Sequence, residues 1–166
     1  MIRYSEKGHW LHEHIASEGY VLMQLDRKWL SNNDKAVQDI IDTFDPLPYA
    51  IADALALVKE AAATKRLQYV TQSAGKDSEY VFKEKEAKQY DIDSNVGIFM
   101  QARMDATGES AKLIAAEWNA KSNAWQAIGA SIAAMGDKAS IDIKAETDWK
   151  RCSVLANNAI KLIEAV

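Results

Sequence analysis

The sequence predicts a mainly α-helical protein, in which a bundle of long amphipathic helices is preceded by a small α+β appendage with a β-hairpin. The chain of 166 residues has only two prolines, and both lie in the DPLP segment at residues 45–48. Proline fixes φ and interrupts helices, so this segment is the expected boundary. Apolar residues recur at helical steps after it, whereas the pattern before it is mixed. We therefore expect a docking appendage at residues 1–47 and a helical-bundle body at residues 48–166.

The appendage is expected to contain two helices and a hairpin. In chain order, the expected elements are an edge strand at 2–5, a helix at 9–17, strands at 20–25 and 28–31, and a helix at 35–44. Gly19 follows the first helix at the position of a C-terminal cap, and Asn33 is one of three possible N-caps for the second. The turn at Asp26-Arg27 lacks the Asn-Gly or Asp-Gly signature, so the hairpin depends on the strand patterns alone.

The body is expected to be helical almost throughout. The expected helices span residue 49 to about 72, 77–90, 96–105, 109–136 and a last segment ending at Val166, with a possible break at 73–75. Three stripes of apolar residues carry this prediction, and the last two alternate steps of four and three, as helices in bundles do. The stripes are Ile51, Leu55, Val58, Ala62 and Tyr69; Ile114, Trp118, Trp125, Ile128, Ile132 and Met135; and Trp149, Cys152, Ala156, Ala159, Ile163 and Val166. Residues 136–145 fit either a loop or a helical continuation.

Charge and composition exclude several classes of function. The net charge is −4 and no stretch is strongly basic, which disfavours a nucleic-acid partner. The sequence contains no run of about 18 apolar residues, so no membrane span is expected. The first ten residues also lack the apolar core of a signal peptide. The single cysteine fits a protein made in a reducing cytoplasm. We therefore expect a soluble protein that contacts neither nucleic acid nor membrane.

No group of residues in the sequence predicts catalysis. His9 and His12 would be neighbours on a helix, but His14 would point away from both, and HWLHEH lacks the HExxH order of zinc sites. Cys152 falls on an apolar stripe, where a thiol behaves as a small buried hydrophobe. The carboxylates near residues 83–88 alternate with lysines, which is typical of a solvated helix face. We expect no metal, no cofactor and no enzymatic activity, against the alternative of a cell-wall hydrolase.

The aromatic residues are the best candidates for contacts with other proteins, because tryptophan and tyrosine are enriched at interfaces. Five tryptophans are many for this length. Three of them lie in the helical body, where they either fill the bundle core or make contacts between subunits. Trp10 and Trp29 lie in an appendage with little core of its own. The interface candidates are Trp10, Trp29, Tyr20, Phe44, Trp118, Trp125 and Trp149.

Two stretches resemble proteins of tailed bacteriophages. The first 48 residues are similar to the start of small proteins encoded beside tail-fibre genes, with matches at residues 4–8, Trp29, 36–38, 40–42 and 45–48. The second half resembles helical segments of phage tail and tail-fibre proteins, with matches at residues 69–80 and 124–132. Residues 91–97 replace the proline-rich linker that is usual before the last helices of that family.

The resemblance implies a structural protein of the virion. It would be a tail-fibre or baseplate-associated component, assembled in the host bacterial cytoplasm, that links or attaches fibres. Its partners would be other tail proteins and further copies of itself, possibly as a trimer, because tails are symmetric assemblies. The alternative is a tail-fibre assembly chaperone that is absent from the mature virion.

Overall fold

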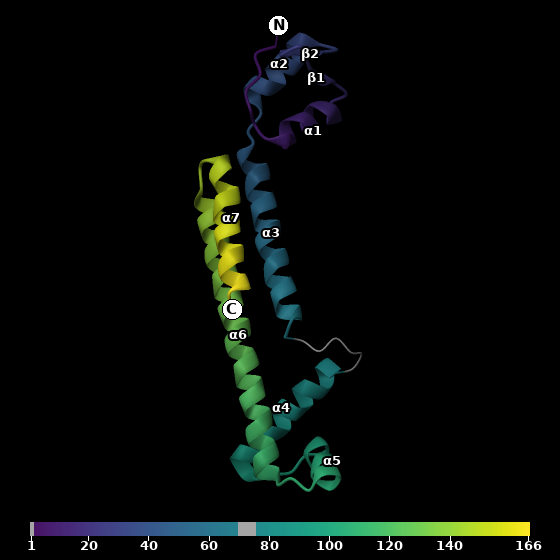
Figure 1. The fold of residues 1–166 in the computed structure, drawn as a ribbon, viewed down its shortest axis with the longest axis vertical. Helices are drawn as coiled ribbons and strands as arrows, with labels where there is room; N and C mark the ends of the chain where they lie inside the picture. Colours follow the sequence, from purple (N-terminus) through teal and green to yellow (C-terminus); the bar gives the residue numbers. More distant parts are fainter. Residues whose placement is uncertain (1, 70–75) are drawn as a thin grey trace. The chain divides into compact units, whose positions relative to one another are not determined.

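The computed structural model describes residues 2–69 and 76–166 of the chain. In this part the element order is α1 (His9–Ser17), β1 (Leu22–Leu25), β2 (Lys28–Ser31), α2 (Asp34–Thr43), α3 (Leu47–Leu67), α4 (Lys76–Asp93), α5 (Ile98–Thr107), α6 (Ala111–Ala145) and α7 (Trp149–Glu164) (Figure 1). The described residues are 75% helical and include an antiparallel hairpin near the N-terminus, which confirms the predicted fold class. The expected break at residues 73–75 lies outside the described residues.

The N-terminal elements surround a small hydrophobic core of their own. Its buried members come from the first residues, α1, α2 and the segment after α2: Ile2, Leu11, Ile15, Val37, Ile41 and Phe44. Each such side chain contributes roughly 1.5–3 kcal/mol when it leaves water. Asn33 caps α2 through its side chain, which accepts a hydrogen bond from the Ala36 N–H. This core holds α1 and α2 together beneath the hairpin.

The hairpin forms as predicted, with its turn at the expected two residues. Leu25 pairs with Lys28 across Asp26 and Arg27, whose φ angles of 49° and 61° are both left-handed. These angles define a type I′ turn, whose twist matches that of the two strands. A left-handed residue other than glycine costs roughly 1–2 kcal/mol, so the hairpin must be stabilised by what it packs against.

The edge strand expected at residues 2–5 is absent from the described structure, so this prediction was wrong. Burial of Ile2 draws the segment towards the core between α1 and α2. Its backbone is satisfied by a side chain instead of a strand: the Arg3 N–H donates to Gln38 Oε1 at 2.7 Å, and Gln38 Nε2 donates to the Arg3 carbonyl at 3.2 Å. An amide side chain has both a donor and an acceptor, so it can replace a strand neighbour at one residue.

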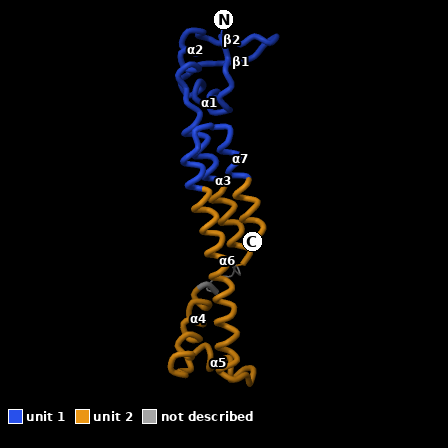
Figure 2. The backbone as a smooth tube through the Cα atoms, turned by 90° about the vertical axis from the view of Figure 1, so that its left-hand side faces the viewer, with its two compact units in different colours: residues 1–57, 140–157 blue, residues 58–139, 158–166 orange. Residues whose placement is uncertain are grey.

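The chain divides into two compact units, which Figure 2 colours separately. Unit 1 comprises residues 1–57 and 140–157, and unit 2 comprises residues 58–139 and 158–166. Helices α3, α6 and α7 each continue from one unit into the other. The predicted boundary near residue 47 therefore differs from this division, and separate folding of residues 1–47 stays a prediction.

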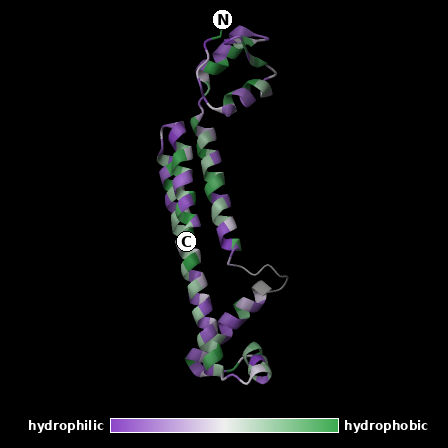
Figure 3. Ribbon diagram, viewed as in Figure 1, coloured by the Kyte–Doolittle hydropathy of each residue, from purple (hydrophilic) through white to green (hydrophobic). Residues whose placement is uncertain are grey.

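Both units use the apolar faces of α3, α6 and α7, whose alternation with polar residues is visible in Figure 3. The buried residues are Ala50, Ala54, Ile143, Cys152 and Ala156 in unit 1, and Val58, Ala62, Ile132, Ala139, Ala159 and Ile163 in unit 2. The stripe predicted for α7 is thus confirmed at its four central positions. On α3 the predicted residues Val58 and Ala62 are buried, but at the start of the helix the small side chains of Ala50 and Ala54 are buried where Ile51 and Leu55 were expected. Residues 136–145 continue α6 as helix.

Unit 2 has a second core where α4 and α5 meet the start of α6. Its buried residues are Ala87, Met100, Ala111, Ile114, Ala115 and Trp118. Helix α5 ends at Thr107, and the left-handed conformation of the next residue, Gly108 (φ 72°), terminates the helix. The chain then turns into α6, which starts at Ala111, close to the predicted start at residue 109.

Candidate protein-interaction surfaces

Trp29 lies in an aromatic cluster within the N-terminal elements. Its ring stacks on Tyr4 with centroids 4.1 Å apart and planes inclined by 18°. The Tyr4 hydroxyl lies 3.0 Å from His12 Nε2, and burial, followed by the charge of Glu6, raises the pKa of Tyr4. The half-buried Trp29 therefore has partners in its own chain, which leaves only part of its surface for another protein.

Trp10 meets a tryptophan that is 139 positions away in the sequence. Its ring contacts Trp149 edge to face, with centroids 5.9 Å apart and an angle of 84°. Its Nε1–H donates to Asp53 Oδ2 at 2.8 Å. Gly8 lies so close to the ring that an added Cβ would be 2.5 Å from two of its atoms. The interface candidates Trp10 and Trp149 thus contact each other within unit 1.

Tyr20 and Phe44 belong to the N-terminal core more than to its surface. Tyr20 is half-buried against that core, and Phe44 is one of its buried members. The Phe44 ring stacks on Tyr49 at 5.2 Å, and its carbonyl accepts a hydrogen bond from Lys7 Nζ at 2.5 Å. These contacts place both residues in packing roles within this chain.

The two remaining tryptophans on α6 differ sharply in exposure. Trp118 is only 7% exposed and belongs to the second core of unit 2, with Lys83 Nζ 5.6 Å from the centre of its ring. Trp125 is 37% exposed, although it lies on the same predicted stripe, and its ring is 6.3 Å from Tyr69. Trp125 is therefore the most accessible of the tryptophan candidates.

The structure reveals an apolar surface on the hairpin that the search for aromatic residues missed. Met23 and Leu25 lie on the outer side of β1, Val21 directly precedes this strand, and Leu30 is paired with Met23 across the sheet. These four side chains, here called the hairpin face, are 41–57% exposed. The opposite side carries Leu22 and Trp29, which pack on the core. The sequence did indicate this surface. Apolar residues of YVLMQL fall on both sides of the strand, but only one side of the hairpin packs on the core.

A second group of exposed apolar side chains lies on α4 and α5 in unit 2. It consists of Val81, Phe82, Ile98 and Phe99, here called the α4/α5 face, which are 38–85% exposed. Phe82 and Phe99 stack on each other with centroids 5.9 Å apart and an interplanar angle of 12°. The sequence placed both Val81 and Ala87 among the charged residues of one helix, but it could not show that Ala87 would be buried and Val81 exposed.

The α4/α5 face is held in place by a carboxylate that caps one helix from another. Glu86 of α4 accepts hydrogen bonds from the backbone N–H groups of Phe99 at 3.1 Å and Met100 at 2.8 Å. These are among the donors that the first turn of a helix leaves unpaired. Gly97 permits this approach, because a Cβ there would be 2.2 Å from Glu86 Cδ. The cap fixes the start of α5, and with it Ile98.

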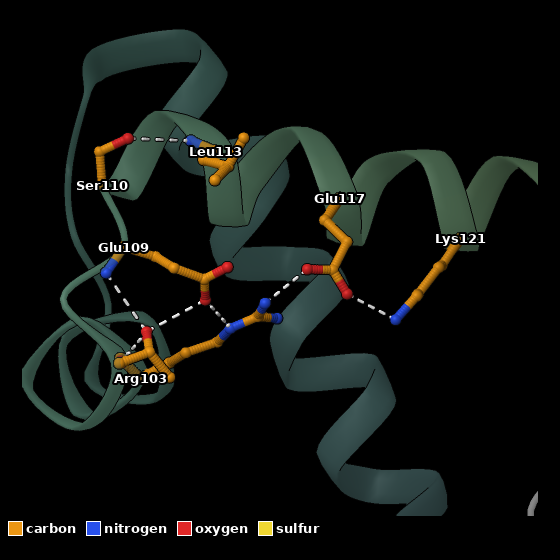
Figure 4. Close-up of polar contacts among 7 residues, drawn as sticks. Arg103, Glu109, Ser110, Leu113, Glu117 and Lys121 are labelled. Atoms are coloured by element: carbon orange, nitrogen blue, oxygen red, sulfur yellow. Dashed lines mark hydrogen bonds and ion pairs between the residues drawn. The ribbon is translucent and has the colours of Figure 1, made fainter.

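An ion network fixes the corner between α5 and α6 (Figure 4). Arg103 Nε donates to Glu109 Oε2 at 2.8 Å, and Arg103 Nη2 donates to Glu117 Oε2 at 2.5 Å. Glu117 also accepts from Lys121 at 2.5 Å. These hydrogen bonds lower the pKa of Glu117 to about 2, and the two carboxylates raise the pKa of Arg103. All four side chains are satisfied by one another, which gives the network an architectural role.

The three histidines have different neighbours. His9 Nε2 lies 3.9 Å from Asp53 Oδ2, His12 contacts Tyr4, and the His14 ring lies 5.4 Å from that of Phe44. Within the described ranges, no three His, Cys, Asp or Glu residues are arranged to hold a metal ion. Cys152 is buried as expected, and burial raises the pKa of its thiol.

No protein-family model, curated protein or solved structure matches the chain. Among residues 2–69 and 76–166, no helix has the length and apolar character needed to cross a membrane.

Proposed function

We propose that the chain is a structural protein of a bacteriophage virion, a tail-fibre or baseplate-associated component that links or attaches fibres through protein–protein contacts. The observation that carries the linking role is that each compact unit has an exposed apolar surface of its own: the hairpin face in unit 1 and the α4/α5 face in unit 2. Contiguous exposed apolar side chains on a folded protein commonly mark contacts with other proteins. A protein that joins two others requires at least two such surfaces.

The phage context is supported by the resemblance of both halves of the sequence to proteins of the tail-fibre region. In this proposal the role is architectural and not catalytic, and the partners are tail-fibre or baseplate proteins and further copies of the chain. The protein would be made in the host cytoplasm and incorporated into the tail. An assembly chaperone remains the second candidate, because exposed apolar faces also suit transient binding of an unassembled fibre.

Phage assembly with variant chains tests the linking role. Val81→Ser combined with Ile98→Ser removes the two most exposed side chains of the α4/α5 face and leaves the Phe82–Phe99 stack intact. We expect particles that lack fibres in electron micrographs and have lost infectivity, with unchanged thermal stability of the purified variant.

The matched control carries the same two types of substitution outside both faces. Val154→Ser with Ile141→Ser replaces a valine and an isoleucine that are also more than half exposed. This control should assemble normally. Normal fibres in the Val81→Ser, Ile98→Ser variant would contradict the proposal, as would an equal defect in the control.

A further inference from the structure

The hairpin is the entire sheet in the described chain, so each strand has one unpaired edge. In an antiparallel pair closed by a two-residue turn, the residues next to the turn exchange both backbone hydrogen bonds, and this pattern repeats at every second residue. Met23 and Leu25 therefore bond to β2, whereas the N–H and C=O groups of Leu22 and Gln24 point to the free edge. No other described segment pairs its backbone with this edge.

The free edge of β1 lacks the features that normally prevent strand addition. Exposed edges are usually protected by a charged residue, a proline or a bulge. The strand Leu22–Leu25 has neither charge nor proline, and its register with β2 is continuous, without a bulge. Its outer side chains Met23 and Leu25, with the adjacent Val21, are apolar and about half exposed. The free backbone N–H and C=O groups and the apolar side chains at this edge are therefore suited to binding an extended strand, and not a helix or a small ligand.

We propose that the occupant is β1 of a second copy of this chain, paired antiparallel about a two-fold axis. In this arrangement Leu22 pairs with Gln24 of the second copy, and Met23 lies beside Met23 of the second copy. Val21 then lies opposite Leu25, so all outward apolar side chains stay on one side of the joined sheet. The strand also brings no like charges together. A second copy of β1 therefore provides an extended, uncharged strand whose apolar side chains lie on the same side of the sheet as those of the first.

Stacking of two hairpin faces would cover these side chains but would leave the free edge of β1 unpaired. Edge pairing adds backbone hydrogen bonds to the apolar contacts. It also joins the two hairpins into one four-stranded sheet.

The joined sheet deepens the proposed function, because the two hairpin faces merge into one apolar surface of eight side chains. Such a surface approaches roughly 600 Å², the upper range of functional patches on monomers, and provides a larger docking site for a tail protein. The pairing predicts dimers, whereas tail symmetry suggested trimers. Dimer formation can be measured on the purified chain alone. A failure to form dimers would therefore not contradict the proposal that the chain is a virion protein.

The mass of the purified full-length chain tests the pairing. We expect a dimer by analytical ultracentrifugation between about 1 and 100 µM, where affinities in the micromolar range become visible. Gln24→Pro removes an N–H that points to the free edge and is not used in the hairpin, a position where edge strands tolerate proline. Met23→Lys places two ammonium groups beside each other at the two-fold axis. Both variants should be monomers with unchanged circular dichroism.

The matched control is Leu30→Lys, which puts the same charge on the same face but on β2, away from the paired edge. It should remain a dimer. A wild-type monomer or trimer at all concentrations would overturn the proposal. So would a monomeric Leu30→Lys together with a dimeric Gln24→Pro, because that combination indicates face-to-face stacking. If Gln24→Pro fails to fold, the comparison of Met23→Lys with Leu30→Lys decides.

Discussion

Gly97 provides the sharpest test of how the α4/α5 face is built. Its backbone angles, φ −80° and ψ 173°, are ordinary for any residue, so alanine meets no backbone penalty there. In such a case, replacing glycine by alanine usually stabilises a protein by about 0.4–1 kcal/mol, because the unfolded chain loses freedom. The local packing predicts the opposite sign for Gly97→Ala.

The added Cβ would lie 2.2 Å from Cδ and 2.4 Å from Cγ of Glu86, so this side chain must move. Movement breaks the hydrogen bonds from the N–H groups of Phe99 and Met100. Loss of a helix cap costs about 0.5–2 kcal/mol, and hydrogen bonds to a charged group contribute roughly 1.5–3 kcal/mol each when buried. Since this site is partly exposed, we expect a net destabilisation of about 1–2 kcal/mol.

Urea unfolding followed by circular dichroism measures this change, and a double-mutant cycle assigns its cause. In a Glu86→Ala background the carboxylate is gone, so adding Gly97→Ala should be neutral or stabilising. Glu86→Gln retains one acceptor oxygen and should cost less than Glu86→Ala. If Gly97→Ala stabilises the otherwise unmodified chain, or costs the same in both backgrounds, the cap described here is wrong.

Three further perturbations address other parts of the structure. Trp10→Phe keeps an aromatic ring but loses the hydrogen bond to Asp53, so it should cost about 1 kcal/mol in urea unfolding, and Asp53→Asn should cost less because it retains an acceptor. The folded-state pKa of Glu117 is lowered to about 2 from 4.5, so its contribution to stability is present above pH 4.5 and is lost as the pH falls towards 2. Glu117→Gln should flatten that part of a pH titration of the melting temperature, and an unchanged titration would contradict the network. Ile132→Asp buries an unpaired carboxylate at a fully buried position and should cost more than about 4 kcal/mol, with loss of helical circular dichroism, whereas the half-buried Ile128→Asp should be milder.

Periodicity predicted the helices well because helical geometry repeats locally. Helix α1 begins and ends where expected, and the stripe from Cys152 to Ile163 is buried. The shift of the buried face at the start of α3 could not be predicted, because alanine and isoleucine both fit an apolar stripe. The choice between them depends on which neighbouring helix is packed there.

The candidate surfaces were harder to predict from the sequence. Residue type favoured the tryptophans, yet Trp10 and Trp149 contact each other, and this contact joins positions too distant in the sequence for local patterns to reveal. The hairpin face and the α4/α5 face were missed because a sequence shows which residues are apolar, but not which of them lack a neighbour. Val81 and Ala87 lie on the same helix, and only the packing of α5 and α6 separates the exposed one from the buried one.

The central claim is that this chain is built into a phage tail through protein contacts. Its most direct test is quantitative mass spectrometry of purified particles of a phage that encodes the chain, with copy number measured against the major tail protein. The proposal predicts a stoichiometric signal at a fixed number of copies per tail. Absence from mature particles, with the chain present in the infected lysate, would contradict a structural role and favour an assembly chaperone.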